Sequence, residues 1–184
     1  MRHYREITPP AGFAPRPGRW IASLGALRAR TIAMIEDLDP EILAVVPAAV
    51  PNSIGTLATH IAEIEAFWIL ERIGGHPLPA TRREIYRMDL FGKPGAPQAP
   101  RAPARYLIGI LDDLRVESCA VLVEMGDDDL DGKRVWVDPD SPQDQELFTV
   151  EWILQHVFAH EAHHQGQIAL IRRLVSPGDA ARAR

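Results

Sequence analysis

Residues 155–167, with the sequence QHVFAHEAHHQGQ, carry the pattern that decides the fold of this chain. This stretch holds four of the seven histidines of the protein within nine residues. Apolar residues run through it and beyond it at helical spacing, which predicts one long helix from an N-cap at Thr149 to about Val175. The apolar stripe of this helix consists of Ile153, Val157, Ile168, Ile171 and Val175.

Two of the four histidines are predicted to face the core. Each residue of a helix turns by roughly 100°, which places His164 in the middle of the apolar stripe and His160 at its edge. His156 lies at the margin of the stripe and His163 outside it. A single core histidine is more often a structural residue, but two buried rings need several polar partners. An i, i+4 pair is a common way for one helix to offer two imidazoles to a metal ion.

A third histidine, His60, lies on a second predicted helix, which begins at Asn52 or Ser53 and ends before Gly74. His60 can turn inward from this helix. Taken alone it is better explained as a structural residue, but with the pair on the last helix it completes a three-histidine site. Three protein ligands leave one coordination position open, which is typical of catalytic rather than structural metal sites.

Two more helices are predicted, over residues 19–38 and 104–125. Four long helices without a convincing strand pair indicate an all-α four-helix bundle. The proline-rich link between the second and third helices is long for a simple hairpin and favours a long crossover; a short helix around 82–88 fits within it. Residues 134–137 form either a short extended piece or a turn. The expected organisation is a proline-rich arm (1–18, where prolines exclude a regular helix), the bundle (19–175) and a tail (176–184).

Composition narrows the function classes. The chain has 184 residues, a net charge of −5 and one cysteine, Cys119, which excludes an internal disulfide. The net negative charge argues against a nucleic-acid partner. No apolar run is long enough to cross a membrane, and the first residues lack the apolar core of a signal peptide. We therefore expect a cytoplasmic protein without a membrane or nucleic-acid partner.

Residues 160–164 also match the zinc-protease motif H-E-x-x-H. In those enzymes a third ligand follows the motif. Here the residues after His164 contain neither His nor Glu, so a protease is not favoured. Glu161 is still expected near the metal.

Two segments together resemble the DinB/YfiT-like superfamily. The first is SIGTLATHIAEIE (53–65), and the second is LQHVFAHEAHHQGQI (154–168). The second matches the family pattern H-x-x-H-H-x-G-Q-I at every defined position, whereas the first is a looser match. The resemblance covers roughly residues 19–175; the stretch 89–103 and the loop 134–145 look particular to this chain.

The resemblance implies a four-helix bundle with a divalent metal ion held by three histidines, which fall on His60, His160 and His164. It also implies a homodimer. This is supported by residues that widen the apolar faces of their predicted helices, namely Trp20, Ile21, Ile108 and Val121. Imidazole-only sites accept several metals, of which we favour Zn or Ni over Cu or Fe. Residues expected around the ligands are Glu161, His163, Gln167 and His156, and Gly166 is expected to let a neighbouring helix approach closely.

The activity that the resemblance implies is that of a transferase or isomerase using a small thiol such as mycothiol or bacillithiol. In that chemistry the metal lowers the pKa of the thiol and so produces a thiolate nucleophile. Two alternatives stay open: a metal-dependent hydrolase, and a non-catalytic metal-binding bundle. A metal-free helical interaction module would require all three histidines to be structural.

Overall fold

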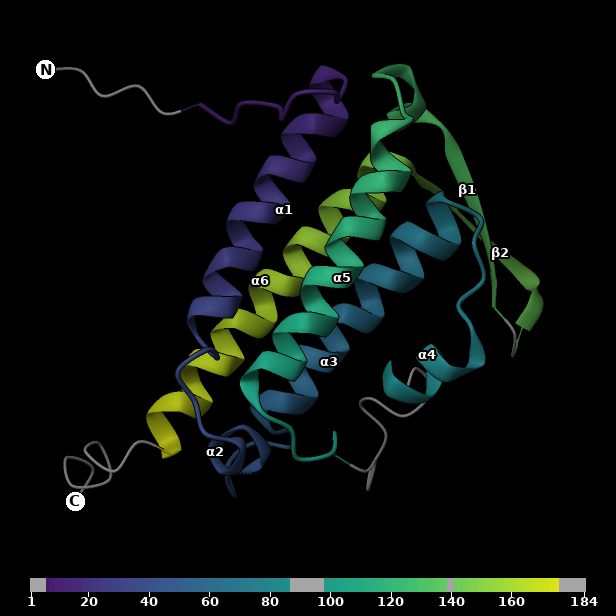
Figure 1. Cartoon of the computed structure of the whole chain (residues 1–184). Helices are drawn as coiled ribbons and strands as arrows, with labels where there is room; N and C mark the ends of the chain where they lie inside the picture. Colours follow the sequence, from purple (N-terminus) through teal and green to yellow (C-terminus); the bar gives the residue numbers. More distant parts are fainter. Residues whose placement is uncertain (1–5, 87–97, 139–140, 176–184) are drawn as a thin grey trace, which may run out of the picture.

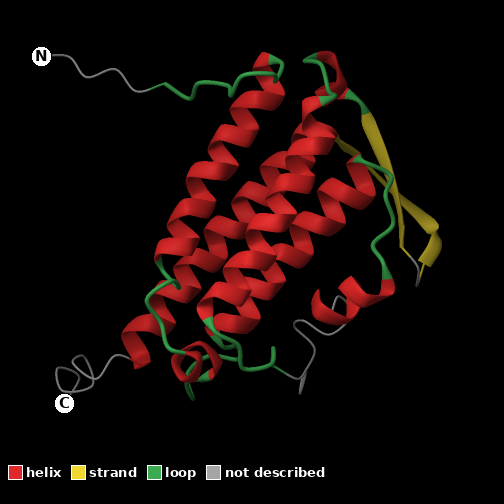
Figure 2. Cartoon of the chain, in the orientation of Figure 1, coloured by secondary structure: helices red, strands yellow, loops and turns green. Residues whose placement is uncertain are grey.

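The structure is a computed structural model that describes residues 6–86, 98–138 and 141–175. It is mostly helical, which confirms the all-α fold class (Figures 1 and 2). The predicted tail, 176–184, lies outside the described residues, as do residues 1–5 of the arm and 87–97 of the link. The elements in chain order are α1 (Pro15–Ala33), α2 (Pro40–Ala44), α3 (Ile54–Glu65), the π-helix η1 (Ala66–Ile73), α4 (Ala80–Tyr86), α5 (Ala104–Val123), the 3₁₀-helix η2 (Asp128–Asp131), β1 (Lys133–Asp138), β2 (Ser141–Thr149) and α6 (Val150–Val175).

The four long helices α1, α3, α5 and α6 form the body of the molecule. Both α1 and α3 pack against α5 and against α6. Figure 1 shows α1 and α6 running in one direction and α3 with α5 in the other. The second and third long helices therefore run parallel, and the chain between them must return along the bundle. Because residues 87–97 lie outside the described part of that link, the predicted crossover stays a prediction.

The start of α1 corrects one expectation. The prolines before residue 19 do not exclude a helix, because α1 begins at Pro15 and contains Pro17 in its first turn. The first N–H groups of a helix have no intrahelical acceptor, so proline is tolerated there. The helix also ends earlier than predicted, at Ala33, where the N–H of Met34 is shared between the carbonyls of Arg30 and Thr31.

The second predicted helix is continuous but changes type. Its N-cap is Ser53, whose hydroxyl accepts a hydrogen bond from the N–H of Thr56 at 3.1 Å. From Ala66 to Ile73 the helix continues with π-type bonds, which shift the later side chains out of phase with those on α3. It ends before Gly75, whose φ of +69° suits glycine. Nothing in the apolar spacing distinguishes this π segment from an α-helix.

An antiparallel hairpin, β1 with β2, corrects the expectation that the chain has no strand pair. The pattern concealed it because β2 has only two large apolar residues, Leu147 and Phe148, and they are adjacent rather than alternating. Phe148 is half-buried against the bundle, whereas Val135 and Leu147, which are paired in the register, face outward.

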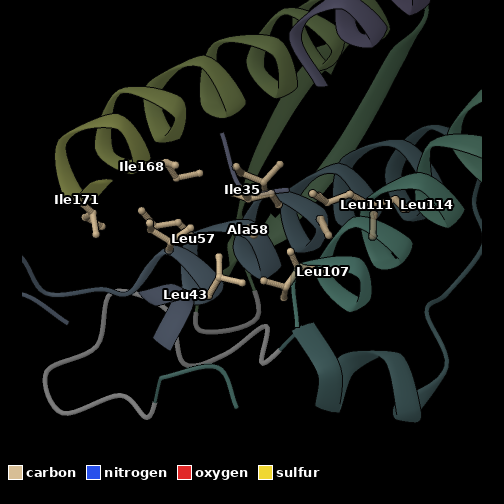
Figure 3. Packing of buried hydrophobic residues seen from close by; sticks show 14 of the residues in the cluster. Ile35, Leu43, Leu57, Ala58, Leu107, Leu111, Leu114, Ile168 and Ile171 are labelled. Atoms are coloured by element: carbon tan, nitrogen blue, oxygen red, sulfur yellow. The ribbon is translucent and has the colours of Figure 1, made fainter. Parts of the chain in front are cut away.

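The core consists of two apolar clusters. One lies among α2, α3, α5 and the second half of α6 (Figure 3). The other lies among α1, η1, the end of α5 and the first half of α6. Buried polar side chains of all four long helices contact one another in the bundle as well, and they are described with the site.

The four residues that supported the homodimer lie in or against these clusters. Ile21 is buried, and Trp20, Ile108 and Val121 are half-buried and packed on the core. Because all four pack on the core, they do not by themselves mark a dimer face, and the homodimer stays a prediction. In the described part of the chain, no helix combines the length and apolar character that crossing a bilayer requires.

Candidate metal centre

Three histidine side chains meet between α3 and α6. His160 Nε2 lies 3.2 Å from His60 Nε2 and 3.1 Å from His164 Nε2. One ligand nitrogen from each of the three residues can be chosen so that all lie within 4.8 Å of one another. His60 and His164 are buried, whereas His160 is partly exposed, so the cluster reaches the surface on one side. We call these three residues the histidine cluster.

In two of these rings, the nitrogen that is not part of the cluster, Nδ1, is hydrogen-bonded to a neighbouring side chain. His60 Nδ1 donates to Glu63 Oε2 at 2.7 Å, and His164 Nδ1 donates to Gln167 Oε1 at 2.7 Å. A carboxylate or amide oxygen only accepts, so these contacts place the ring protons on Nδ1. The Nε2 atoms of both rings therefore present lone pairs to the cluster, as a metal ligand must.

Burial keeps the three rings neutral. It lowers the pKa of His60 to about 4, and that of His164 also to about 4, although the bond to Gln167 partly opposes the shift. Burial also lowers the pKa of His160 to about 3, with a smaller contribution from the neighbouring histidines. Neutral imidazole is the form that binds metals, so the cluster is in its binding form at neutral pH.

The donor set fits a metal ion. Two of the three Nε2 atoms are acceptors, and His160 can offer at most one proton from its own Nε2. A cation between the rings, by contrast, would accept a lone pair from all three Nε2 atoms at once. Three imidazoles suit Zn, Ni, Cu or Fe rather than Mg or Ca. Among the described residues no other group of three or more His, Cys, Asp or Glu brings ligand atoms this close.

The other expected neighbours occupy different places. Gln167 lies against His164, and its amide nitrogen is 3.1 Å from Nε2 of the exposed His163. His156 stands outside the cluster, with its ring centroid 6.2 Å from that of His160. Glu161, which was expected near the metal, points away from the histidines and accepts hydrogen bonds from Arg28 and Thr31 of α1.

A row of stacked rings leads along α6 to the cluster. Phe148 stacks on Trp152 with centroids 4.4 Å apart, and Trp152 stacks on His156 at 5.0 Å. Trp68 of η1 meets all three rings edge-on, at 5.2–5.8 Å. Trp152 is 41% exposed, so the row reaches solvent at Trp152, and its other end, His156, lies next to His160.

Glu63 and Trp68 belong to the site but were not among the predicted site residues. The spacing of His60 and Glu63, i and i+3 on one helix, was the available signal for the first. Trp68 had no comparable signal, since its position depends on the π segment and on the unpredicted hairpin.

Comparison with known families places most of the chain in one of them. The family model described as the DinB superfamily matches residues 23–168, a span that contains the whole histidine cluster. A search of curated protein sequences finds no match.

Proposed function

Since this chain belongs to the DinB superfamily, we propose that its histidine cluster binds one divalent metal ion and that the protein transfers or isomerises groups with the help of a small thiol. The observation that carries the metal site is the convergence of three Nε2 atoms whose rings are oriented from behind by Glu63 and Gln167. Zn and Ni are the metals that we favour for it.

Three side chains would hold the ion, and a coordination position would be left for an atom of a second molecule. When bound, a divalent cation supplies Lewis acidity, which lowers the pKa of a thiol or a water molecule in that position. Glu63 keeps His60 in the tautomer that exposes Nε2, and Gln167 does the same for His164.

The surroundings of the cluster favour a small molecule with an apolar part. The aromatic row beside His160 gives such a molecule a surface that is already assembled, with Trp152 open to solvent. A metal-dependent hydrolase is the alternative, and a non-catalytic metal-binding bundle is the third reading.

Metal stoichiometry tests the ligand set. Replacing His60, His160 or His164 with Ala should reduce bound metal from about one ion per chain to almost none, measured by elemental analysis after Zn²⁺ loading and desalting. His163→Ala is the matched control, because His163 lies on the same helix but is exposed. Equal losses from His163→Ala and His164→Ala would overturn the ligand assignment.

Cobalt substitution tests the open position and the thiol preference. The visible spectrum of the Co²⁺ protein should change when a small thiol is added, and the same amount of a matched alcohol should leave it unchanged. A spectrum that ignores every added ligand would mean that a fourth protein group closes the site. The catalytic proposal would then fail, and the metal-binding bundle would be the better reading.

A further inference from the structure

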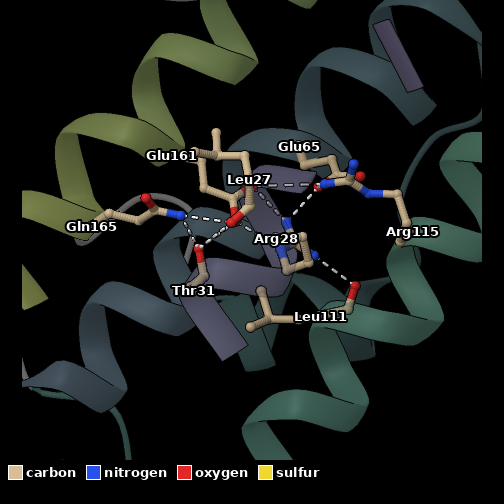
Figure 4. A network of polar contacts seen from close by, with 8 residues as sticks. All are labelled: Leu27, Arg28, Thr31, Glu65, Leu111, Arg115, Glu161 and Gln165. Carbon is tan, nitrogen blue, oxygen red and sulfur yellow. Dashed lines mark hydrogen bonds and ion pairs between the residues drawn. The ribbon is translucent and has the colours of Figure 1, made fainter. Parts of the chain in front are cut away.

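Four charged side chains, one from each long helix, meet inside the bundle (Figure 4). They are Arg28 of α1, Glu65 of α3, Arg115 of α5 and Glu161 of α6, and we call them the four-charge cluster. The side chains of Arg28, Glu65 and Glu161 are at most 4% exposed, and that of Arg115 is 13% exposed.

Arg28 binds to the other three long helices at once. Its Nη2 donates to Glu65 at 2.7 Å, its Nε to Glu161 at 2.9 Å, and its Nη1 to the backbone carbonyl of Leu111 on α5 at 2.7 Å. Arg115 adds a second link, at 2.9 Å to Glu65 and 3.6 Å to Glu161. The two helices that carry the histidine cluster, α3 and α6, are thus joined through guanidinium groups.

On α6 the residues of this network directly follow the histidines. Glu161 follows His160, and Gln165 follows His164. Glu161 accepts from Thr31 Oγ1 at 2.6 Å, and Gln165 donates to the carbonyl of Leu27, also on α1, at 2.6 Å. Consecutive residues of a helix point roughly 100° apart, so fixing Glu161 and Gln165 against α1 also fixes the directions of the two histidines.

Stability alone does not account for these buried charges. The two arginines balance the two glutamates, but the cost of removing four charges from water largely offsets their attraction. Apolar residues of similar size often serve as well or better in such positions, and the best-attested use of buried polar groups is to fix helix register. If α6 rotated, new apolar contacts could replace many of those that were lost. The hydrogen bonds of the four-charge cluster, in contrast, would break.

We propose that the four-charge cluster, together with Gln165, positions the metal site by fixing the rotation of α6 against α1 and α3 so that His160 and His164 face His60. Arg28, Glu161 and Gln165 are positioning residues in this proposal, since their hydrogen bonds go to one another's helices and to α1, α3 and α5 rather than to the metal-binding nitrogens. The proposal rests on the proposed function for the metal, but the arrangement of the three rings can be measured without it.

The double variant Arg28→Met/Glu161→Met tests the proposal. It removes one charge of each sign and leaves Arg115 paired with Glu65, so each remaining buried charge keeps one partner of opposite sign. We expect helical content to be retained by circular dichroism, while the affinity for Zn²⁺ falls by about 10-fold or more in a competition titration. In the metal-free protein, the nuclear Overhauser contacts between the ring of His60 and those of His160 and His164 should weaken or disappear.

Arg16→Met/Glu151→Met is the matched control. Arg16 and Glu151 also pair α1 with α6, at 2.7 Å, but in the first turns of these helices and outside the four-charge cluster. This control should keep both the Zn²⁺ affinity and the ring contacts. If it loses as much Zn²⁺ affinity as the test variant, the site depends on any α1–α6 link and the proposal is overturned.

The two readouts separate this proposal from the proposed function. A test variant that keeps its Zn²⁺ affinity and its ring contacts overturns the positioning role and leaves the metal site standing. If the unaltered protein binds no Zn²⁺, the proposed function fails, and the ring contacts of the metal-free protein still decide the positioning role. Should the double variant not fold, Gln165→Met must weaken the ring contacts for the proposal to hold, because it removes two α6–α1 hydrogen bonds without touching a charge.

Discussion

The histidine cluster shows an asymmetry at the level of single atoms. Nδ1 of His60 and of His164 has a side-chain partner, whereas the hydrogen-bond contacts of His160 within the described residues all involve Nε2. Ring orientation at His60 and His164 therefore depends on Glu63 and Gln167. The ring of His160 is oriented by its place on α6 and by its two neighbouring histidines.

Removal of the Glu63 carboxylate should weaken metal binding. Glu63→Leu takes away the acceptor that holds His60 Nδ1–H, so we expect the affinity for Zn²⁺ to fall about 10–100-fold in a competition titration. Glu63→Gln is the matched control, because its amide oxygen can still accept that proton and it should lose much less. Equal effects of the two variants would mean that the charge, rather than the hydrogen bond, is what matters.

The metal-free protein should lose stability as the pH falls from about 6.5 towards about 4. The histidine pKa values are lowered by burial to about 3–4 from 6.5, so below 6.5 the unfolded chain binds protons that the folded one does not. This contribution is fully present above pH 6.5 and is lost as the pH falls through that range. Urea unfolding with a chelator at pH 7, 6 and 5 measures it.

His160→Gln separates this effect from the titration of carboxylates, which both proteins share. The variant lacks the ring whose pKa is lowered most, so its stability should fall less steeply with decreasing pH. Parallel stability profiles for the two proteins would show that His160 is protonated equally in the folded and unfolded states.

Sequence predicted the directions of the three histidines well, since helical periodicity alone orients side chains on long regular helices. It could not find the partners of Glu161. Arg28 lies on another helix, 133 residues away in the chain, and its spacing on α1 does not mark it as buried. The H-E-x-x-H match favoured a metal neighbour for Glu161, whereas packing against α1 makes it an ion-pair partner.

At the scale of elements, the regular helices were predictable and the irregular segments were not. α5 and α6 lie within a few residues of their predicted bounds, because both have long apolar stripes and clear ends. The hairpin was missed because its second strand lacks alternation, and the π segment because apolar spacing does not encode it. The start of α1 was predicted too late, because proline disrupts the interior of a helix but is tolerated in its first turn.

Gly166 on α6 offers a test at this scale. It was expected to allow close helix packing, but among the described residues a Cβ at this position would meet no atom of another element within 4 Å, so that expectation is wrong. Gly166→Ala should therefore raise the free energy of unfolding by about 0.5–1 kcal/mol, because alanine reduces the freedom of the unfolded chain. Chemical denaturation measures the gain.

Gly109→Ala is the matched control, since Gly109 on α5 also has open space around it and should give a similar gain. A loss of stability in Gly166→Ala alone would contradict the open space around this position.

At the scale of the whole molecule, the bundle has two apolar clusters that do not need a metal ion. Large side chains such as Leu24, Leu57, Leu111 and Ile153 are fully buried in these clusters. The metal would link only α3 and α6, and the four-charge cluster already joins these two helices. The fold and the metal site are therefore expected to be separable.

Removal of the metal should leave the fold intact. After chelation we expect unchanged helical content by circular dichroism and a moderate fall in melting temperature. A ligand at 100 times its Kd stabilises the folded state by about 2.7 kcal/mol, which for a chain of this size corresponds to a shift of roughly 5–10 °C. His60→Ala, which should bind no metal, is the control: a chelator should not change its melting temperature. If the unaltered protein instead unfolds on chelation, the ion is structural. A bundle whose core forms without metal would stay folded when only the link between α3 and α6 is removed.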